Sequence, residues 1–528
     1  MSATAAALPS PHRQMAGVGP AKFAGFMVMV LGMFMAILDI QIVSASIAEI
    51  QAGLAASPDE ASWIQTSYLI AEIVMIPLSG FLSRLLSTRV LFTISALGFT
   101  VFSLACAMAT SLPLMIAFRA AQGFLGGAMI PTVFATAFIL FPAKQRTRVS
   151  VLIGLTATLA PTIGPTLGGL LTETFSWHWL FLINVPVGLL VAGVVWRTMF
   201  IDEGDRRLLA HFDWWGLAFM AVFLGSLEYV MEEGPRWEWL EDETIAFFAL
   251  VALLSGIAFF WRAFTRREPI VDLRAYGNAN FAIGSLFAFI VGIGLYGAVY
   301  LVPLFLGRVR GFNSLQIGET MFVTGLAMFI AAPIVGQMAQ RMDVRVVLAM
   351  GLGITSYALW LTAGLTTLSG FWELALPLAL RGVGTMMVMV PVNQVALGTL
   401  PPARIKNASG LYNLMRNLGG AVGLAMINTL VTDRGAAHRL HLAEQVSSGR
   451  VAATQWYDNL ANALTPRLGE AQASIAALRR IAQMVEQQAM VLAYNDVLIV
   501  MSLLFAGAIP LVLLLSKPQA APGGGGAH

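Results

Sequence analysis

The 528-residue chain is too apolar to fold as a water-soluble globule. Hydrophobic residues make up 58% of the sequence and charged residues 11%, and the mean hydropathy is +0.77. A soluble surface needs about a quarter of its residues charged, so the composition predicts an all-α polytopic membrane protein. The net charge of +3 gives no indication of a nucleic-acid partner. The single cysteine, Cys106, can form neither an intrachain disulfide nor a metal site.

Fourteen apolar segments are long enough to cross a membrane as helices, which takes about 20 residues. They lack the polar–apolar alternation of barrel strands. The first is too long for a cleaved signal peptide and is expected to be a retained signal anchor. The predicted spans occupy residues 23–46, 62–83, 89–110, 113–139, 149–171, 178–199, 214–231, 245–264, 279–306, 315–338, 344–365, 372–398, 408–431 and 491–515.

The basic residues orient these spans. With the N-terminus in the cytoplasm, nineteen of the 31 lysines and arginines fall in inside segments, and the short outside loops hold only Arg236, Arg308 and Arg310. This positive-inside pattern predicts that both termini are cytoplasmic. Residues 432–490 are too polar to span and are expected outside. There, Ile475, Leu478, Ala482, Val485 and Ala489 recur at helical spacing, which predicts an amphipathic helix leading into the last span.

An internal repeat divides the chain. Pro77-Leu-Ser-Gly80 is followed by Arg89-Val90, and Pro333-Ile-Val-Gly336 is followed by Arg345-Val346, each position 256 residues later. Spans 1–6 and 9–14 are therefore predicted to be two copies of one six-helix unit, with spans 7 and 8 inserted between them. Two such parallel repeats are the layout of major facilitator halves. The chain is predicted to begin with a cytoplasmic segment (1–22) and an N-terminal half (23–199), followed by a linker that carries the two inserted spans (200–277). A C-terminal half (278–515), which includes the outside loop 432–490, and a flexible tail (516–528) complete it.

Charged residues inside spans cost insertion energy and are therefore candidates for function. They are Asp39, Glu72, Arg119, Glu228, Glu319, Arg381, Arg416 and Asp496. Asp39 and Glu72 lie deepest, where a carboxyl in a low-dielectric site can exchange a proton. An interhelical hydrogen-bonded pair without transport is the alternative. Glu228, Glu319 and Asp496 lie near span ends, where an interfacial position explains them equally well.

Polar residues inside other spans predict a substrate cavity. Tyr68 lies one helical turn before Glu72, and a tyrosine beside a carboxylate suits a cationic or amphipathic aromatic ligand. The remaining predicted cavity residues are Asn393, Gln394, Tyr412 and Arg381.

The fifth span combines small residues with prolines at Gly154, Pro161, Gly164, Pro165, Gly168 and Gly169. Small residues allow close helix packing, and Pro165 bends its helix. This face is expected to seal or hinge the two halves, with plain helix packing as the alternative.

No enzyme motif or cofactor motif is present. The sequence has no G-x-x-x-x-G-K-[ST] loop, nucleophile elbow or zincin motif, so neither catalysis nor direct use of ATP is predicted. His438, His441 and Glu444 follow one another at three-residue steps, but solvated side chains explain them better than a metal site. No cofactor or metal is expected, and the proton gradient is the expected energy source.

Four motifs carry a family resemblance. They are Gly164-Pro165-Thr-Leu-Gly168-Gly169 after Gly154, Arg119-Ala-Ala-Gln122-Gly123, Leu38-Asp39-Ile-Gln-Ile42-Val43, and Trp179-Leu-Phe181-Leu-Ile-Asn184-Val-Pro186-Val-Gly188. Together they resemble the fourteen-span drug:proton antiporter branch of the major facilitator superfamily, and the long outside loop is similar to that of EmrB-type multidrug efflux permeases. The resemblance implies proton coupling at Arg119. It also implies an inner-membrane permease that works with an EmrA-type periplasmic adaptor and a TolC-type outer-membrane channel.

The chain departs from the family at two places. The usual loop motif after span 2 is G-x-L-A-D-R-x-G-R-K, whereas this chain has Gly80-Phe-Leu82-Ser-Arg84-Leu-Leu-Ser-Thr-Arg89, with arginine in place of the acidic residue. Span 1 has Gln41 and Ser44 where threonine and asparagine are usual.

The expected function is proton-driven export of small amphipathic toxic compounds by alternating access. Asp39, Arg119, Glu72 and Glu319 are expected to take part in proton coupling. A dedicated exporter or importer of one metabolite, such as a siderophore or lipid, is the alternative within the superfamily. A sensor or channel is the alternative outside it.

Overall fold

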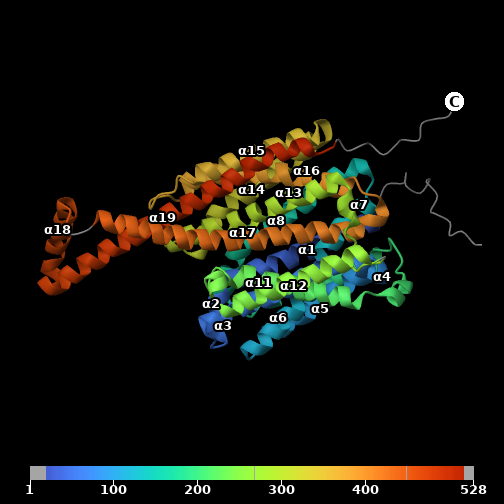
Figure 1. Ribbon diagram of the computed structural model, residues 1–528, viewed down its shortest axis with the longest axis horizontal. Helices are drawn as coiled ribbons and strands as arrows, with labels where there is room; N and C mark the ends of the chain where they lie inside the picture. The colour runs from blue at the N-terminus through green and yellow to red at the C-terminus, as the bar shows by residue number, and fades with distance from the viewer. Residues whose placement is uncertain (1–18, 267, 447–448, 517–528) are drawn as a thin grey trace, which may run out of the picture.

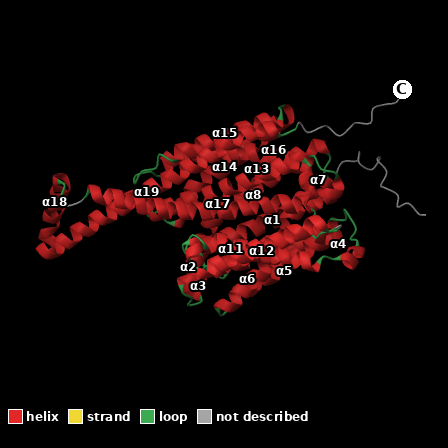
Figure 2. Ribbon diagram, viewed as in Figure 1, coloured by secondary structure: helices red, strands yellow, loops and turns green. Residues whose placement is uncertain are grey.

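The computed structural model describes residues 19–516 except 267 and 447–448, and the regular structure of these residues is helical throughout (Figure 2). All but the first residue of the predicted flexible tail, and all but the last residues of the predicted N-terminal segment, lie outside the described residues. The α-helices are α1 (Pro20–Ala45), α2 (Ile47–Gly53), α3 (Pro58–Ala61), α4 (Trp63–Leu86), α5 (Thr88–Ala107), α6 (Leu112–Gly126), α7 (Met129–Leu140), α8 (Ala143–Thr174), α9 (Trp179–Leu182), α10 (Asn184–Thr198), α11 (Trp214–Glu233), α12 (Glu243–Thr265), α13 (Ala279–Arg308), α14 (Ser314–Arg341), α15 (Val344–Thr362), α16 (Phe371–Gly398), α17 (Pro402–Gln445), α18 (Val451–Leu468) and α19 (Glu470–Ala508). The short 3₁₀ helices are η2 (Arg206–His211), η3 (Trp239–Glu241), η4 (Leu273–Gly277) and η5 (Ile509–Leu514).

The predicted span count is confirmed. Fourteen helical stretches among the described residues are long and apolar enough to cross a membrane, and each overlaps one predicted span. The fourth span is built from α6 and α7, which meet at Gly127-Ala128, and the sixth from α9 and α10. The all-helical fold class is therefore also confirmed.

The last long loop projects from the bundle as a helical hairpin. Figure 1 shows α17 and α19 running out of the bundle together, with α18 at the far tip. At 44 residues, α17 is about 66 Å long, roughly twice the thickness of a bilayer core. The predicted amphipathic helix is confirmed as the first part of α19, but its Ile475 and Leu478 are 54% and 58% exposed. We call this end of the bundle the hairpin end, and the opposite end, where α1 begins, the terminal end.

Glycines allow the main helices of the bundle to pack with their backbones close together. α13 packs along α17, where a Cβ added at Gly423 would lie 2.8 Å from the Ile293 Cα. α1 packs against α8, and α8 in turn packs against α14. Since close approach of this kind needs small residues at the contact, these glycines fix how near the helices lie.

The first inserted helix joins both sides of the bundle. α11 packs against its partner α12 and also against α4 and α17. At its hairpin end, Trp63 of α4 stacks on Tyr229 of α11 with ring centroids 5.4 Å apart. The Trp239 indole just beyond α11 donates a hydrogen bond to the Thr429 hydroxyl of α17 at 3.0 Å. α11 is therefore a structural part of the bundle rather than a peripheral addition.

Candidate functional site

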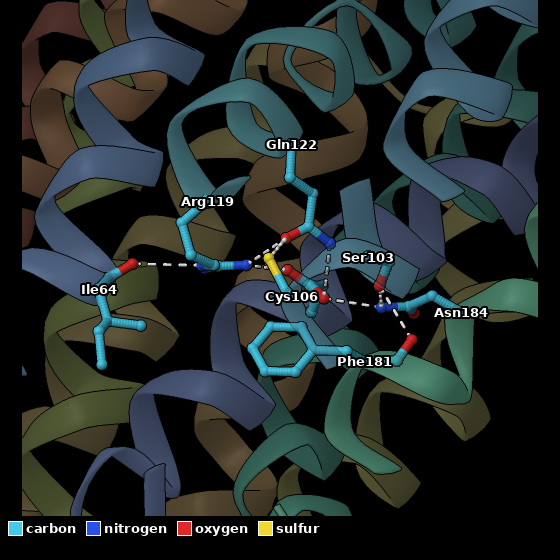
Figure 3. Close-up of polar contacts among 8 residues, drawn as sticks. Ile64, Ser103, Cys106, Arg119, Gln122, Phe181 and Asn184 are labelled. Atoms are coloured by element: carbon cyan, nitrogen blue, oxygen red, sulfur yellow. Dashed lines mark hydrogen bonds and ion pairs between the residues drawn. The ribbon is translucent and has the colours of Figure 1, made fainter. Parts of the chain in front are cut away.

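A fully buried ion pair joins α1 to α6. The Arg119 guanidinium donates to Asp39 Oδ2 at 2.6 Å, and both side chains are 0% exposed. Arg119 Nε also donates to the Ile64 carbonyl at 3.2 Å (Figure 3). Its guanidinium lies over the Tyr68 ring, 4.2 Å from the ring centroid. The structure thus brings together two residues that are 80 positions apart in the sequence.

Amide and hydroxyl groups surround this pair. Asp39 Oδ1 accepts from Asn184 Nδ2 at 2.7 Å and from Gln122 Nε2 at 3.2 Å. Asn184 also donates to Ser103 Oγ, which in turn donates to the Phe181 carbonyl (Figure 3). The carboxylate therefore receives donors from three side chains, as a buried charge requires.

This network can respond to a single proton. A protonated Asp39 loses its charge and part of its acceptor capacity, so its bonds to Arg119 and Asn184 weaken. Breaking a buried pair by removing one partner costs about 3–5 kcal/mol. Protonation of Asp39 would therefore weaken the contact between α1 and α6 and favour a rearrangement of these helices.

A cavity of about 440 Å³ lies beside this network. It is bordered by α1, α4, α8, α11, α13, α14 and α17, and so lies between the predicted halves. Its volume is in the range of sites for drug-sized ligands. The lining residues are Ile40, Gln41, Ser44, Ala45, Gln65, Leu69, Glu72, Ile73, Pro165, Glu228, Met231, Glu232, Tyr296, Val299, Tyr300, Pro303, Leu304, Ile317, Asn417, Gly420, Ala421, Leu424, Ala425 and Asn428.

The cavity reaches the hairpin end and adjoins the ion pair. Ala45 and Glu232 lie at or next to the hairpin-end limits of their helices. Ile40 and Gln41, which follow Asp39 directly in α1, also line the cavity. A ligand in the cavity would therefore touch the same helical turn that carries the buried carboxyl.

The opposite, terminal end is closed by backbone contact between α4 and α17. A Cβ added at Gly80 would lie 2.8 Å from the Asn407 Cα, and one added at Gly410 would lie 3.0 Å from the Ile76 carbonyl. Ser409 of α17 also donates to the Pro131 carbonyl of α7 at 2.6 Å. At these two contacts the helices meet backbone to backbone with no room for a side chain, which closes the terminal end.

Comparisons with known proteins place this architecture in a family. Residues 29–424 match the family description Major Facilitator Superfamily. The chain belongs to the Major Facilitator Superfamily. It is similar to the colistin resistance protein EmrB of Acinetobacter baumannii, with 42% identity over 91% of this chain and 94% of that protein. It is also similar to the multidrug export protein EmrB of Escherichia coli K12, with 29% identity over 94% of this chain and 96% of that one.

Solved structures agree on the fold. The chain resembles the crystal structure of the human organic anion transporter MFSD10 with a TM-score of 0.57 and 14% identity, covering 92% of this chain and all of that one. At this identity the likeness concerns the fold alone. The resemblance to EmrB-type major facilitator proteins, expected from the motifs, is confirmed by the sequence relatives. The protein is a multi-pass membrane protein of a transporter family.

Of the predicted cavity residues, only Glu72 lines the observed cavity. It lies on a stretch of α4 against which Gly123 and Gly127 of the fourth span pack. Tyr68 is instead buried beneath Arg119. The Tyr412 hydroxyl donates to Asn393 Oδ1 at 2.5 Å, away from the cavity.

The other predicted charged and polar residues lie elsewhere. Arg381 donates to Thr324 Oγ1 at 3.1 Å and borders a separate void of about 20 Å³. Gln394 is half-buried in α16, outside the cavity lining. Glu319 of α14 is exposed and does not border the cavity. Asp496 pairs with His438 at 2.9 Å on the hairpin, and no metal-binding cluster occurs among the described residues.

The glycine- and proline-rich motif of α8 faces two ways. Gly164 packs against Gln41 of α1, and a Cβ added at Gly168 would lie 2.9 Å from the Ile42 carbonyl. Gly154 instead faces Met389 of α16, where an added Cβ would lie at 3.8 Å. Pro165 borders the cavity. The remaining motif residues, Pro161 and Gly169, lie inside the same helix.

A carboxylate from another segment binds next to the loop after α4, where this chain has Arg84 instead of the usual acidic residue. Asp202 accepts hydrogen bonds from Thr88, from the backbone N–H at 3.1 Å and from the hydroxyl at 3.0 Å. It also forms an ion pair with Lys406 of α17, whose ammonium group donates to the Ser83 carbonyl at 2.8 Å. Asp202 thus ties the loop after α4 to α17 at the closed terminal end, although the loop itself lacks the usual acidic residue.

The sequence indicated other residues of the site only weakly. Glu228 is a charge near a span end that an interfacial position explains equally well, and Glu232 lies just beyond the predicted span 214–231. Both line the cavity. Their spacing of one helical turn on α11 was the available signal, because residues four apart share a helix face.

Proposed function

We propose that the protein is a proton-coupled exporter of amphipathic drugs or toxic compounds that works by alternating access. The observation that carries this proposal is the buried Asp39–Arg119 pair directly beside a drug-sized cavity that is closed at one end. The names of the two relatives, colistin resistance and multidrug export, support the same class of substrate.

The proposed cycle follows from the geometry. If both termini are cytoplasmic, the conformation described is outward-facing, with the cavity toward the periplasm and the terminal end closed. A proton that reaches Asp39 weakens its pairing with Arg119 and loosens α1 against the fourth span. The substrate leaves toward the hairpin end, and the proton leaves once the terminal end has opened.

Glu72 and Glu319 differ in their position relative to the cavity. Glu72 borders the cavity and is buried, so it is proposed as a second proton-accepting group in contact with substrate. Glu319 stays a prediction from its position in a span, since its side chain is exposed outside the cavity. Arg381, which donates to Thr324, stays a predicted substrate-cavity residue.

We propose that the hairpin binds a periplasmic adaptor of the EmrA type, and through it a TolC-type outer-membrane channel. The projection of α17, α18 and α19 beyond the bundle and the exposed Ile475 and Leu478 support this. Photocrosslinkers placed along residues 433–488 are expected to capture a one-span periplasmic protein. Crosslinkers placed on α12 give the background level of capture. A yield from the hairpin positions no higher than this background would contradict this part of the proposal.

The test of transport uses everted membrane vesicles with a pre-formed proton gradient. Added ethidium is expected to dissipate the gradient in vesicles with the wild-type protein. Asp39→Asn keeps the shape of the side chain but removes the proton-accepting group, so the response is expected to be lost. Glu241→Gln, an exposed change on the loop after α11, is the matched control. An undiminished response in Asp39→Asn would remove Asp39 from the coupling step.

A further inference from the structure

The first inserted helix supplies two acidic groups to the cavity. Glu228 and Glu232 lie one helical turn apart on α11, and both border the cavity together with Glu72 of α4. α11 is held in this position by its packing against α4 and α17. Three carboxyl groups from two helices therefore line one space, and none of the described residues that line it is a lysine, arginine or histidine.

Among the described residues, no donor forms a hydrogen bond with Glu228 Oε2. The Glu228 side chain is 5% exposed, and this Oε2 atom is buried. The charged groups close enough to act on it are Glu232 and Glu72, which are acidic as well. Glu72, in contrast, lies within electrostatic reach of Arg416 and Arg119. A buried carboxyl without a donor is costly, so a ligand that brings a donor and a positive charge relieves this cost.

Other polar atoms of the lining point to the same chemistry. Gln65 Oε1 and Asn417 Oδ1 are also buried without partners, and both belong to residues that border the cavity. Like Glu228 Oε2, these atoms accept hydrogen bonds and cannot donate them. The cavity thus offers unpaired acceptors on α4, α11 and α17, and the complementary ligand group is a donor such as an ammonium.

The rest of the lining is apolar and aromatic. Tyr296 and Tyr300 border the cavity on α13, next to Leu304, and Met231 borders it between the two glutamates of α11. Aromatic faces attract cations, and the flexible methionine side chain adapts to varied shapes. An amphipathic molecule can therefore place its apolar body against α13 and its charged group against α11.

We propose that this cavity selects amphipathic organic cations and that Glu228 of α11 holds their ammonium-type centre, with Glu72 and Glu232 adding to the negative potential. This inference rests on the proposed function, because it names the substrate class of the same cavity. It gives the inserted helices a role of their own, since the group that contacts the cation lies on α11.

Direct binding to the purified protein tests the inference without a proton gradient. The probes are three molecules with one ring system and different charges, namely 1-naphthylmethylammonium, 1-naphthylmethanol and 1-naphthoate, titrated by calorimetry. The ammonium form is expected to bind about tenfold or more tightly than either of the others, since a hydrogen bond to a charged group contributes that much. Glu228→Gln is expected to remove this preference, whereas Glu241→Gln on the outer loop keeps it.

The pattern of losses separates charge recognition from damage to the cavity. In Glu228→Gln the affinity for the ammonium probe is expected to fall while that for the alcohol stays unchanged. Equal affinities for all three probes in the wild-type protein would overturn the proposal, and so would a parallel loss for ammonium and alcohol in Glu228→Gln. Cation selectivity without proton coupling in vesicles would leave this inference standing and remove the proposed function, whereas coupled export without charge preference would do the reverse.

Discussion

The ion pair between Asp202 and Lys406 is expected to hold the terminal end closed. Asp202 belongs to the loop after α10, whereas Lys406 lies in the first turns of α17, so the pair joins the two sides that must separate when this end opens. The two side chains are 20% and 13% exposed, which places the pair between the surface and the interior. Lys406→Gln removes the charge and retains most of the side-chain length.

The magnitude follows from the bonds that are lost. Lys406 pairs with Asp202 and donates to the Ser83 carbonyl, and a hydrogen bond to a charged group contributes about 1.5–3 kcal/mol. If the open state lacks these bonds, their loss shifts the equilibrium toward it by about ten- to a hundredfold, since 1.4 kcal/mol is a factor of ten. Asp202→Asn is expected to act in the same direction, because it removes the charge with which Lys406 pairs.

Spin-label distances across the terminal end measure this shift. One label is placed at the N-terminal end of α5, near Thr88, and the other at the start of α17. The background carries Cys106→Ser and is therefore free of other cysteines. Lys406→Gln and Asp202→Asn are each expected to increase the fraction of molecules in which the two labels are far apart. Arg404→Gln, an exposed change two residues away on α17, is the control. An unchanged distance distribution in both Lys406→Gln and Asp202→Asn would refute the reasoning.

Three further variants test separate parts of the structure. Asn184→Ala removes a donor from Asp39, which is expected to cost about 1–3 kcal/mol of stability and to weaken substrate-induced proton flux in vesicles; stability and flux equal to wild type would contradict the network. Gly80→Val places a side chain against the Asn407 backbone, so the spin-label distance across the terminal end should lengthen, and an unchanged distance would mean that the seal lies elsewhere. Arg262→Ala breaks the 2.6 Å pair with Asp213 that joins α11 to α12; it is expected to lower the midpoint of thermal unfolding, and an unaltered midpoint would show that this pair contributes nothing.

The architecture could be predicted from the sequence because the bilayer imposes a strong length and polarity requirement. Every predicted span corresponds to a helical stretch, and the amphipathic start of α19 is also present. The helix ends were less predictable. α17 continues to Gln445, well beyond its predicted end at residue 431, because no proline interrupts this stretch and α19 packs alongside.

The site was only partly predictable, because the composition of a span does not fix the direction in which its side chains point. Asp39 and Arg119 were proposed together from their motifs, and the structure pairs them. Tyr68 and Glu72 share a helix face, yet Tyr68 packs beneath Arg119 and only Glu72 borders the cavity. The difference is set by neighbouring helices, above all by how closely the fourth span approaches α4 at Gly123 and Gly127.

The role of the linker residues depended on tertiary structure altogether. Asp202 follows α10 with no motif around it, yet it supplies the carboxylate that the loop after α4 lacks. Glu228 lies on an inserted span for which the repeat offers no counterpart, and its access to the cavity follows from the packing of α11 on α4 and α17. Contacts between segments more than a hundred residues apart leave no local pattern in the sequence.

The central claim is that a proton gradient drives substrate through this cavity by way of Asp39. Its most direct test is ethidium movement in proteoliposomes that contain only the purified protein and an imposed pH gradient. The account predicts ethidium transport against its own gradient, a reversal of direction when the pH gradient is inverted, and loss of both in Asp39→Asn. Ethidium flux that is the same with and without the pH gradient, or that persists against its gradient in Asp39→Asn, would contradict it.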